Sequence, residues 1–171
     1  MKFQFNTLQK IKGIIIFYMI ALLLAGFTAF PIEWELKTIC GLIERIGNDW
    51  ISQLAIVNFI YEVKDSIVDI NTNSPYISYG FDWLAFAHIV IALLFIGPYK
   101  DPIRNKWVIY WGMIACVGIF PLAFICGPIR SIPLYWTFID CSFGFFGIFP
   151  LLLCIKYIHQ LEKEQNSLPN Q

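Results

Sequence analysis

Four ionisable side chains lie within or beside apolar stretches at the ends predicted to face the outer side of a membrane: His88, Asp140, Arg130 and Asp82. A charged side chain at the centre of a bilayer costs about 2.5 to 3.5 kcal/mol on insertion scales, so each of these residues is a candidate for function. Histidine exchanges protons near neutral pH, and a carboxylate bonded to its ring orients it and raises its basicity. The residue types therefore suit proton transfer or ligand binding.

His88 and Asp140 are expected at similar depths below the outer surface of the membrane. His88 follows the interfacial Trp83 by five residues, about 7 Å of helix, and Asp140 follows Trp136 by four residues, about 6 Å. Small residues lie on the same helix face as each of these side chains. Ala85 and Ala92 share the face of His88, and Gly144 and Gly147 share the face of Asp140. Both side chains are thus predicted to face helix contacts, where they can form a hydrogen bond.

Arg130 precedes the last apolar stretch and is predicted to reach the same carboxylate. Asp82 is placed at the mouth of this candidate outer-leaflet site but off the His88 face, since six residues rotate a helix by about 240°. Three interpretations stay open. The His88–Asp140 pair is a structural clamp between two helices, a working site, or a pair of side chains at a water-filled rim.

The composition that surrounds these residues is that of a membrane protein. Hydrophobic residues make up 58% of the 171-residue chain, charged residues only 14%, and mean hydropathy is +0.64. We predict an all-α integral membrane protein, a single membrane domain with four transmembrane helices in an antiparallel bundle. The spans are expected at about 13–31, 81–97, 102–126 and 136–158. The first is expected to stay uncleaved, because Phe27 would occupy a position of a signal-peptide site that requires a small residue.

Residues 32–80 form the one long polar excursion, for which we predict an extracytoplasmic helical cap of one or two amphipathic helices. Apolar residues recur at helical spacing over 34–46, and Gly47-Asn48-Asp49 interrupts them. A second helix is expected from Asn48 or Asp49 to between Lys64 and Asp69, followed by a loop over 71–80. A simple solvated connector is the alternative.

Basic residues are divided unevenly between the two sides, eight against four. One side has Lys2, Lys10, Lys12, Lys100, Arg104, Lys106, Lys156 and Lys163, and the other has Lys37, Arg45, Lys64 and Arg130. By the positive-inside rule, the N- and C-termini are cytoplasmic, and we expect a multi-pass protein of a bacterial inner membrane. The polar tail over 159–171 is predicted to be cytoplasmic and disordered at its tip.

Several local features predict how the helices meet and bend. Ala21, Ala25 and Ala29 recur every four residues, which suits close helix packing, although ordinary alanines in an apolar helix explain them equally well. Asp101 and Pro102 are expected to start the third span as its N-cap and first residue. Pro121 and Pro150 are expected to kink the spans in which they lie.

No cofactor is predicted. The five cysteines form no Cys-x-x-Cys motif and no zinc spacing with histidine. His88 and His159 are predicted near opposite faces of the membrane, so one chain cannot hold a haem between them. A haem held by a single histidine, or shared across a dimer, is the alternative.

The function predicted first is that of a non-enzymatic accessory or binding protein. Its expected partners are membrane lipids, a membrane-protein partner or a second copy of the chain, and no nucleic acid, because the net charge is zero and basic residues form no block. The alternative is a membrane enzyme or proton-coupled carrier that uses His88, Asp140 and Arg130.

Overall fold

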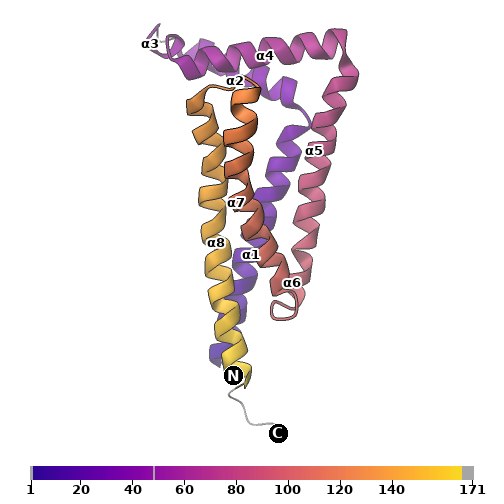
Figure 1. The fold of residues 1–171 in the computed structure, drawn as a ribbon, viewed down its shortest axis with the longest axis vertical. Coiled ribbons are helices and arrows are strands. Elements are labelled where there is room, and N and C mark those ends of the chain that lie inside the picture. Colours follow the sequence, from indigo (N-terminus) through magenta and orange to yellow (C-terminus); the bar gives the residue numbers. More distant parts are fainter. Residues whose placement is uncertain (1, 48, 167–171) are drawn as a thin grey trace. The chain divides into compact units, whose positions relative to one another are not determined.

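The computed structural model describes residues 2–47 and 49–166, and these residues form helices and turns without a strand. In chain order the helices are α1 (Lys2–Ala29), α2 (Ile32–Ile46), α3 (Asp49–Ser52), α4 (Ala55–Asn73), α5 (Pro75–Leu94), α6 (Ile96–Lys100), α7 (Lys106–Ile129) and α8 (Leu134–Asn166) (Figure 1). They belong to two compact units. Residues 21–91 are called the cap unit below, and residues 1–20 with 92–171 the hairpin unit.

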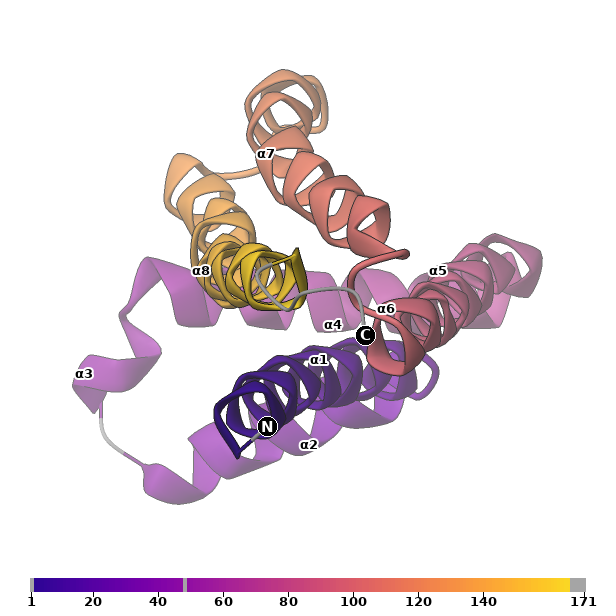
Figure 2. The same cartoon turned by 90° about the horizontal axis from the view of Figure 1, so that it is seen from below.

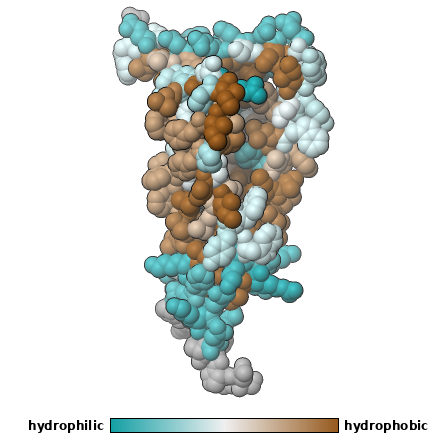
Figure 3. Space-filling model, viewed as in Figure 1, coloured by the Kyte–Doolittle hydropathy of each residue, from teal (hydrophilic) through white to brown (hydrophobic). Residues whose placement is uncertain are grey.

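Among the described residues, four helical segments are long and apolar enough to cross a membrane. They are Asn6–Ala29, Pro75–Lys100, Lys106–Ile129 and Leu134–Asn166. Only 17 to 28% of their most hydrophobic windows is buried within the protein, so most of their apolar side chains are exposed. In the space-filling view hydrophobic residues cover much of these segments (Figure 3). Such a surface is unfavourable in water and suits lipid, which indicates an integral membrane protein.

Within the cap unit, α1 and α5 approach closely at a glycine. A Cβ added to Gly26 would lie 2.9 Å from the Ala85 carbonyl oxygen and 3.1 Å from the His88 Cβ. Ala85 is fully buried at this contact, whereas Ala21 and Ala25 are exposed. The predicted alanine stripe is therefore not the packing surface, and the small residue that permits the approach is Gly26.

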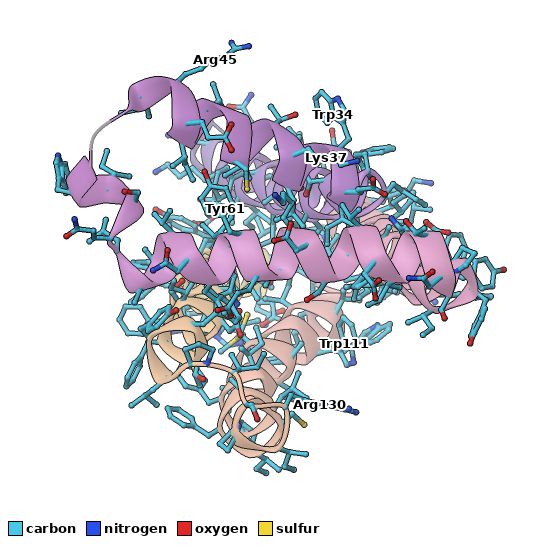
Figure 4. All side chains as sticks on the ribbon, turned by 90° about the horizontal axis from the view of Figure 1, so that it is seen from above. Trp34, Lys37, Arg45, Tyr61, Trp111 and Arg130 are labelled. Carbon is cyan, nitrogen blue, oxygen red and sulfur yellow. The ribbon has the colours of Figure 1, made fainter. Side chains whose placement is uncertain are left out.

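The polar segment of the cap unit is helical, with α2 beside α4 (Figure 4). Helix α2 ends at Gly47, whose left-handed backbone, at φ 61°, is the conformation for which glycine has no steric penalty. The predicted interruption after residue 46 is confirmed. Tyr61 of α4 lies between the two helices and donates a hydrogen bond to the Cys40 carbonyl at 3.4 Å.

Two predicted boundaries in this segment are wrong. The stretch over 71–80 is helical and not a loop, because α4 continues to Asn73 and α5 begins at Pro75 after a one-residue break. Proline suits the first position of a helix, where its missing N–H costs nothing, so the loop-type composition marks a helix start. The predicted second helix is divided in two, since α3 ends at Ser52 and α4 begins at Ala55.

In the hairpin unit, α7 and α8 pack side by side and are joined by residues 130–133 (Figures 1 and 2). A Cβ on Gly144 of α8 would lie 2.5 Å from the Cys116 carbonyl oxygen of α7, so the backbones nearly touch there. The side chain of Leu151 of α8 similarly packs against Gly112 of α7. Small residues therefore set the spacing of these two helices.

Two helix ends in the hairpin unit also differ from prediction. Asp101 does accept a hydrogen bond from the Arg104 N–H at 3.0 Å, but residues 102–105 form a turn and α7 begins at Lys106. The tail is helical over 159–166, because α8 continues without a break to Asn166. Lys106 Nζ donates to Glu162 Oε1 at 2.7 Å and stabilises this extension. The predicted disorder at the tip falls on residues 167–171, which lie outside the described residues.

Candidate functional site

A polar cluster in the cap unit gathers side chains from three helices around the ends of two spans. Glu33 and Lys37 are one turn apart on α2, and Ser78 and Asp82 are one turn apart on α5. Asn71 comes from the last turn of α4. The pairs share a face because residues four apart on a helix are neighbours. The one-residue break before Pro75 brings the end of α4 next to the start of α5.

Hydrogen bonds connect the cluster. Lys37 Nζ donates to Glu33 Oε1 at 2.5 Å, and Asn71 Nδ2 donates to Glu33 Oε2 at 2.5 Å. The Ser78 hydroxyl donates in turn to Asn71 Oδ1. The bond from Lys37 and then the bond from Asn71 hold the pKa of the Glu33 carboxyl below its usual range. Glu33 is therefore an ionised acceptor with both oxygens engaged.

These residues line an open cavity of about 540 Å³. Its other walls include the aromatic residues Phe30, Trp34, Tyr79 and Phe81, and Asp82 forms part of its lining. In the view from above, Trp34 and Lys37 belong to the same end of α2 (Figure 4). Among the described residues, Asp82 takes part in no ion pair. The cavity thus combines a paired carboxylate, an unpaired one, a lysine and aromatic surface.

A second, apolar cavity of about 290 Å³ adjoins the first. It is lined by Phe30, Tyr79, Asp82, Trp83 and Phe86, of which the first three also line the polar cavity. Phe86 lies one helical turn further along α5 than Asp82, towards the middle of the spanning segment Pro75–Lys100. The polar and the apolar cavity therefore share three wall residues near the start of the span.

His88 lies deeper on α5, beside the Gly26 contact. Its ring Nδ1 donates to the Leu84 carbonyl oxygen at 2.8 Å, since a carbonyl only accepts. This bond assigns the proton of neutral His88 to Nδ1 and leaves Nε2 as the acceptor. Ala85 and Ala92, predicted to share its face, are both fully buried.

Asp140 and Arg130 belong to the hairpin unit, whereas His88 and Asp82 belong to the cap unit. Asp140 is half-buried on α8, and Gly144, predicted to share its face, is buried against α7. Arg130 follows the end of α7 and is exposed, with its side chain extending away from the helices (Figure 4). The ion pairs of the described residues do not include one between Arg130 and Asp140. The His88–Asp140 pairing stays a prediction.

The two predicted kink sites lie inside helices, Pro121 in α7 and Pro150 in α8. Each removes one backbone donor without ending its helix. Pro150 contributes to an apolar surface hollow of about 370 Å³ that also involves Gly13 and Phe17 of α1. The kinks themselves stay a prediction.

The part of the chain that the structure describes was searched for side chains that could together hold a metal ion. No three side chains among His, Cys, Asp and Glu are grouped there as a metal ion requires. His159 is exposed at the far end of α8, and its Nε2 is 3.1 Å from the Tyr110 hydroxyl in a hydrogen bond. The haem alternative, which depends on His88 or His159, stays a prediction.

The sequence interpretation overlooked most of the polar cluster: Glu33, Lys37, Asn71 and Ser78. One signal was present, because Glu33 with Lys37 and Ser78 with Asp82 both have the four-residue spacing of helical neighbours. Aromatic residues flank both pairs. The connection through Asn71 depends on how α4 meets α5, which spacing alone does not indicate.

The chain matches no protein-family model, no curated protein and no solved structure. Its function is therefore argued from its own geometry.

Proposed function

We propose that this protein is a multi-pass membrane protein that binds a lipid-like amphiphile at the membrane interface and catalyses no reaction. The observation that carries the proposal is the junction of the two cavities, which share Phe30, Tyr79 and Asp82. An open polar cavity that shares wall residues with an apolar one suits a ligand with a polar headgroup and an acyl chain. The cavities lie where a span begins, which is the level of lipid headgroups.

The arrangement in the membrane is part of the proposal. The four spans form an antiparallel bundle, and α2 and α4 are amphipathic helices that cover its extracytoplasmic end. Both termini are cytoplasmic in a bacterial inner membrane, because the segments on that side carry eight of the twelve basic residues. A reporter active only in the cytoplasm, fused at the C-terminus or inserted at Gly47, tests this orientation. Signal from the Gly47 insertion and none from the C-terminal fusion would reverse it.

Lipid retention tests the binding function. The protein is extracted in a mild detergent and examined by native mass spectrometry, and we expect most molecules to carry one phospholipid. Replacing both shared aromatic walls, Phe30→Ala with Tyr79→Ala, is expected to remove the retained lipid. The matched control is Tyr76→Ala, because Tyr76 is exposed on α5 and lines neither cavity. Wild-type protein free of lipid, or equal retention in all variants, contradicts the proposal.

A second function, a proton-coupled carrier or membrane enzyme that uses His88, Asp140 and Arg130, is favoured by one observation. The His88 ring is hydrogen-bonded through Nδ1 to the Leu84 carbonyl oxygen, so this bond fixes the orientation of the ring and does not engage Nε2. Comparing His88→Phe and Asp140→Leu with wild type in proteoliposomes under a pH gradient tests this function. If the wild type moves protons into the proteoliposomes and the folded variants do not, the carrier function is favoured over the binding function. Altered stability alone would indicate a structural clamp.

A further inference from the structure

Within the polar cavity, one carboxylate is fully engaged and another is open. Both oxygens of Glu33 accept hydrogen bonds, from Lys37 and from Asn71. Asn71 in turn accepts from Ser78, so the cluster is satisfied internally. Asp82 lines the same cavity and forms no ion pair among the described residues. Asp82 is thus the acceptor that a ligand would meet.

The charges of the cavity favour a cation. Glu33 and Asp82 are two carboxylates and Lys37 is one ammonium, so the lining has a formal charge of −1 when all three are ionised. The lowered pKa of Glu33 keeps that carboxylate charged at neutral pH. An ionised carboxylate pairs favourably with a cationic donor through charge-assisted hydrogen bonds. A ligand ammonium on Asp82 would pair with the one carboxylate of this lining that has no ion pair among the described residues.

Lys37 offers the complementary contact. Its ammonium has three N–H donors, and one of them points to Glu33 Oε1. The side chain is 54% exposed, so its remaining donors are accessible. An anionic group bound there would sit at the water-facing side of the cavity. Lysine binds phosphate as a point charge, which suits this position.

We infer that the ligand's headgroup is a zwitterion with a primary ammonium and a phosphate, as in phosphatidylethanolamine. The ammonium binds Asp82, the phosphate binds Lys37, and an acyl chain follows the apolar cavity past Trp83 and Phe86. A primary ammonium is preferred to a choline group because only the former donates N–H bonds to a carboxylate. This inference rests on the proposed lipid-binding function and specifies its ligand.

The test uses Trp83, which lines the apolar cavity, as a reporter. A variant that keeps only this tryptophan, with the other five changed to phenylalanine, is reconstituted in phosphatidylcholine vesicles. The vesicles contain matched fractions of acyl-brominated phosphatidylethanolamine, phosphatidylcholine or phosphatidylglycerol, which quench a tryptophan that they contact. We expect phosphatidylethanolamine to be enriched at Trp83 by about tenfold over phosphatidylcholine, the effect of one charge-assisted hydrogen bond.

Two substitutions test the contacts to the headgroup, and a third serves as a control. Asp82→Asn keeps the shape of the side chain, removes its charge and is expected to abolish the preference. Lys37→Gln is expected to weaken binding of both zwitterionic lipids. Asp69→Asn is the control, because Asp69 lies on α4 outside both cavities. Native mass spectrometry of delipidated protein with its full set of tryptophans, titrated with the same lipids, repeats the comparison should the single-tryptophan variant misfold.

The outcomes separate this inference from the function on which it rests. Equal enrichment of phosphatidylethanolamine and phosphatidylcholine, or preference for phosphatidylglycerol, overturns the primary ammonium while lipid binding stands. A preference that survives Asp82→Asn overturns the role of Asp82. Binding of glycerophosphoethanolamine, the same headgroup without acyl chains, with the same affinity as the lipid shows a site for the free headgroup and overturns the acyl-chain contact. Absence of any retained lipid overturns both proposals.

Discussion

The interactions between helices inside the hairpin unit differ from those inside the cap unit. In the hairpin unit, α7 and α8 meet through small residues, and Gly144 brings one backbone against the Cys116 carbonyl of the other. In the cap unit, α2, α4 and α5 are joined by side-chain hydrogen bonds through Asn71, beside open cavities. The contact between α7 and α8 is closely packed at Gly144, whereas the polar network of the cap unit lies beside an open cavity. The helices of the two units thus meet in different ways, through close backbone approach in the hairpin unit and through side-chain hydrogen bonds in the cap unit.

The largest effect is expected from Gly144→Ala in the hairpin unit. The new Cβ would lie 2.5 Å from a backbone oxygen that cannot move without separating α7 and α8. Overpacking of this kind costs about 3 kcal/mol, measurable as a lower midpoint of unfolding in denaturing detergent. Gly118→Ala is the control, because its Cβ meets nothing within 4 Å and alanine favours a helix. Equal stability of the two variants would refute the close-packed hairpin.

Gly26→Ala tests the close approach of α1 to α5 in the cap unit. Its Cβ would lie 2.9 Å from the Ala85 oxygen and 3.1 Å from the His88 Cβ. We expect a loss of about 1 to 2 kcal/mol, smaller than for Gly144 because the clash is less severe. Gly13→Ala, with open space around the added carbon, serves as the reference in the same helix. A loss larger than that of Gly144→Ala would invert the comparison between the units.

Asn71→Leu should loosen the cap unit locally, because it removes the residue that connects Glu33 with Ser78. The expected cost is about 1 kcal/mol, seen as faster amide hydrogen exchange in α2 with unchanged exchange in α7 and α8. Asn73→Leu, which changes an exposed residue bonded only within α4, is the matched control. Faster exchange throughout the chain would mean that the units are not independent.

The smallest effect is expected when the pH is lowered, because the stability of the cap unit depends on the charge of Glu33. Because the pKa of Glu33 is lowered in the folded protein, its stabilisation is complete above the unfolded pKa. It is lost as the pH falls through the folded pKa. Fluorescence of a variant with Trp34 alone is expected to change in this acidic range, and Glu33→Gln is expected to abolish the change. A variant with Trp136 alone, in α8, should not follow it.

The hydrophobic stretches predicted where the four membrane helices lie, because a run of apolar residues is a long and unambiguous signal. Gly47 also predicted the end of α2, because the left-handed backbone that ends the helix depends on the glycine itself and not on a tertiary contact. Helix ends that depend on tertiary contacts were missed. The start of α5 at Pro75 looks like a loop, and the last turns of α8 are too polar to be predicted as helix without Lys106 opposite Glu162.

For the candidate site, the sequence indicated the ionisable residues that are unfavourable in an apolar stretch. It did not indicate which side chains they contact. His88 and Asp82 stand out because ionisable groups are rare in apolar stretches. Glu33, Lys37, Asn71 and Ser78 are ordinary polar residues in a polar segment, and only the packing of α2, α4 and α5 makes them a cluster. Depth along a helix is readable from sequence, whereas the partner across a helix contact is not.

The length of α8 has a practical consequence. Its 33 residues extend about 50 Å, while the hydrocarbon core of a bilayer is about 30 Å thick. A continuous helix of this length that stands upright, with its start at one boundary of the core, would extend about 20 Å beyond the hydrocarbon core on the other side. A fluorescent or affinity tag attached behind residue 166 would then be held clear of the lipid headgroups, which makes this end of the chain suited to immobilising the protein for binding measurements.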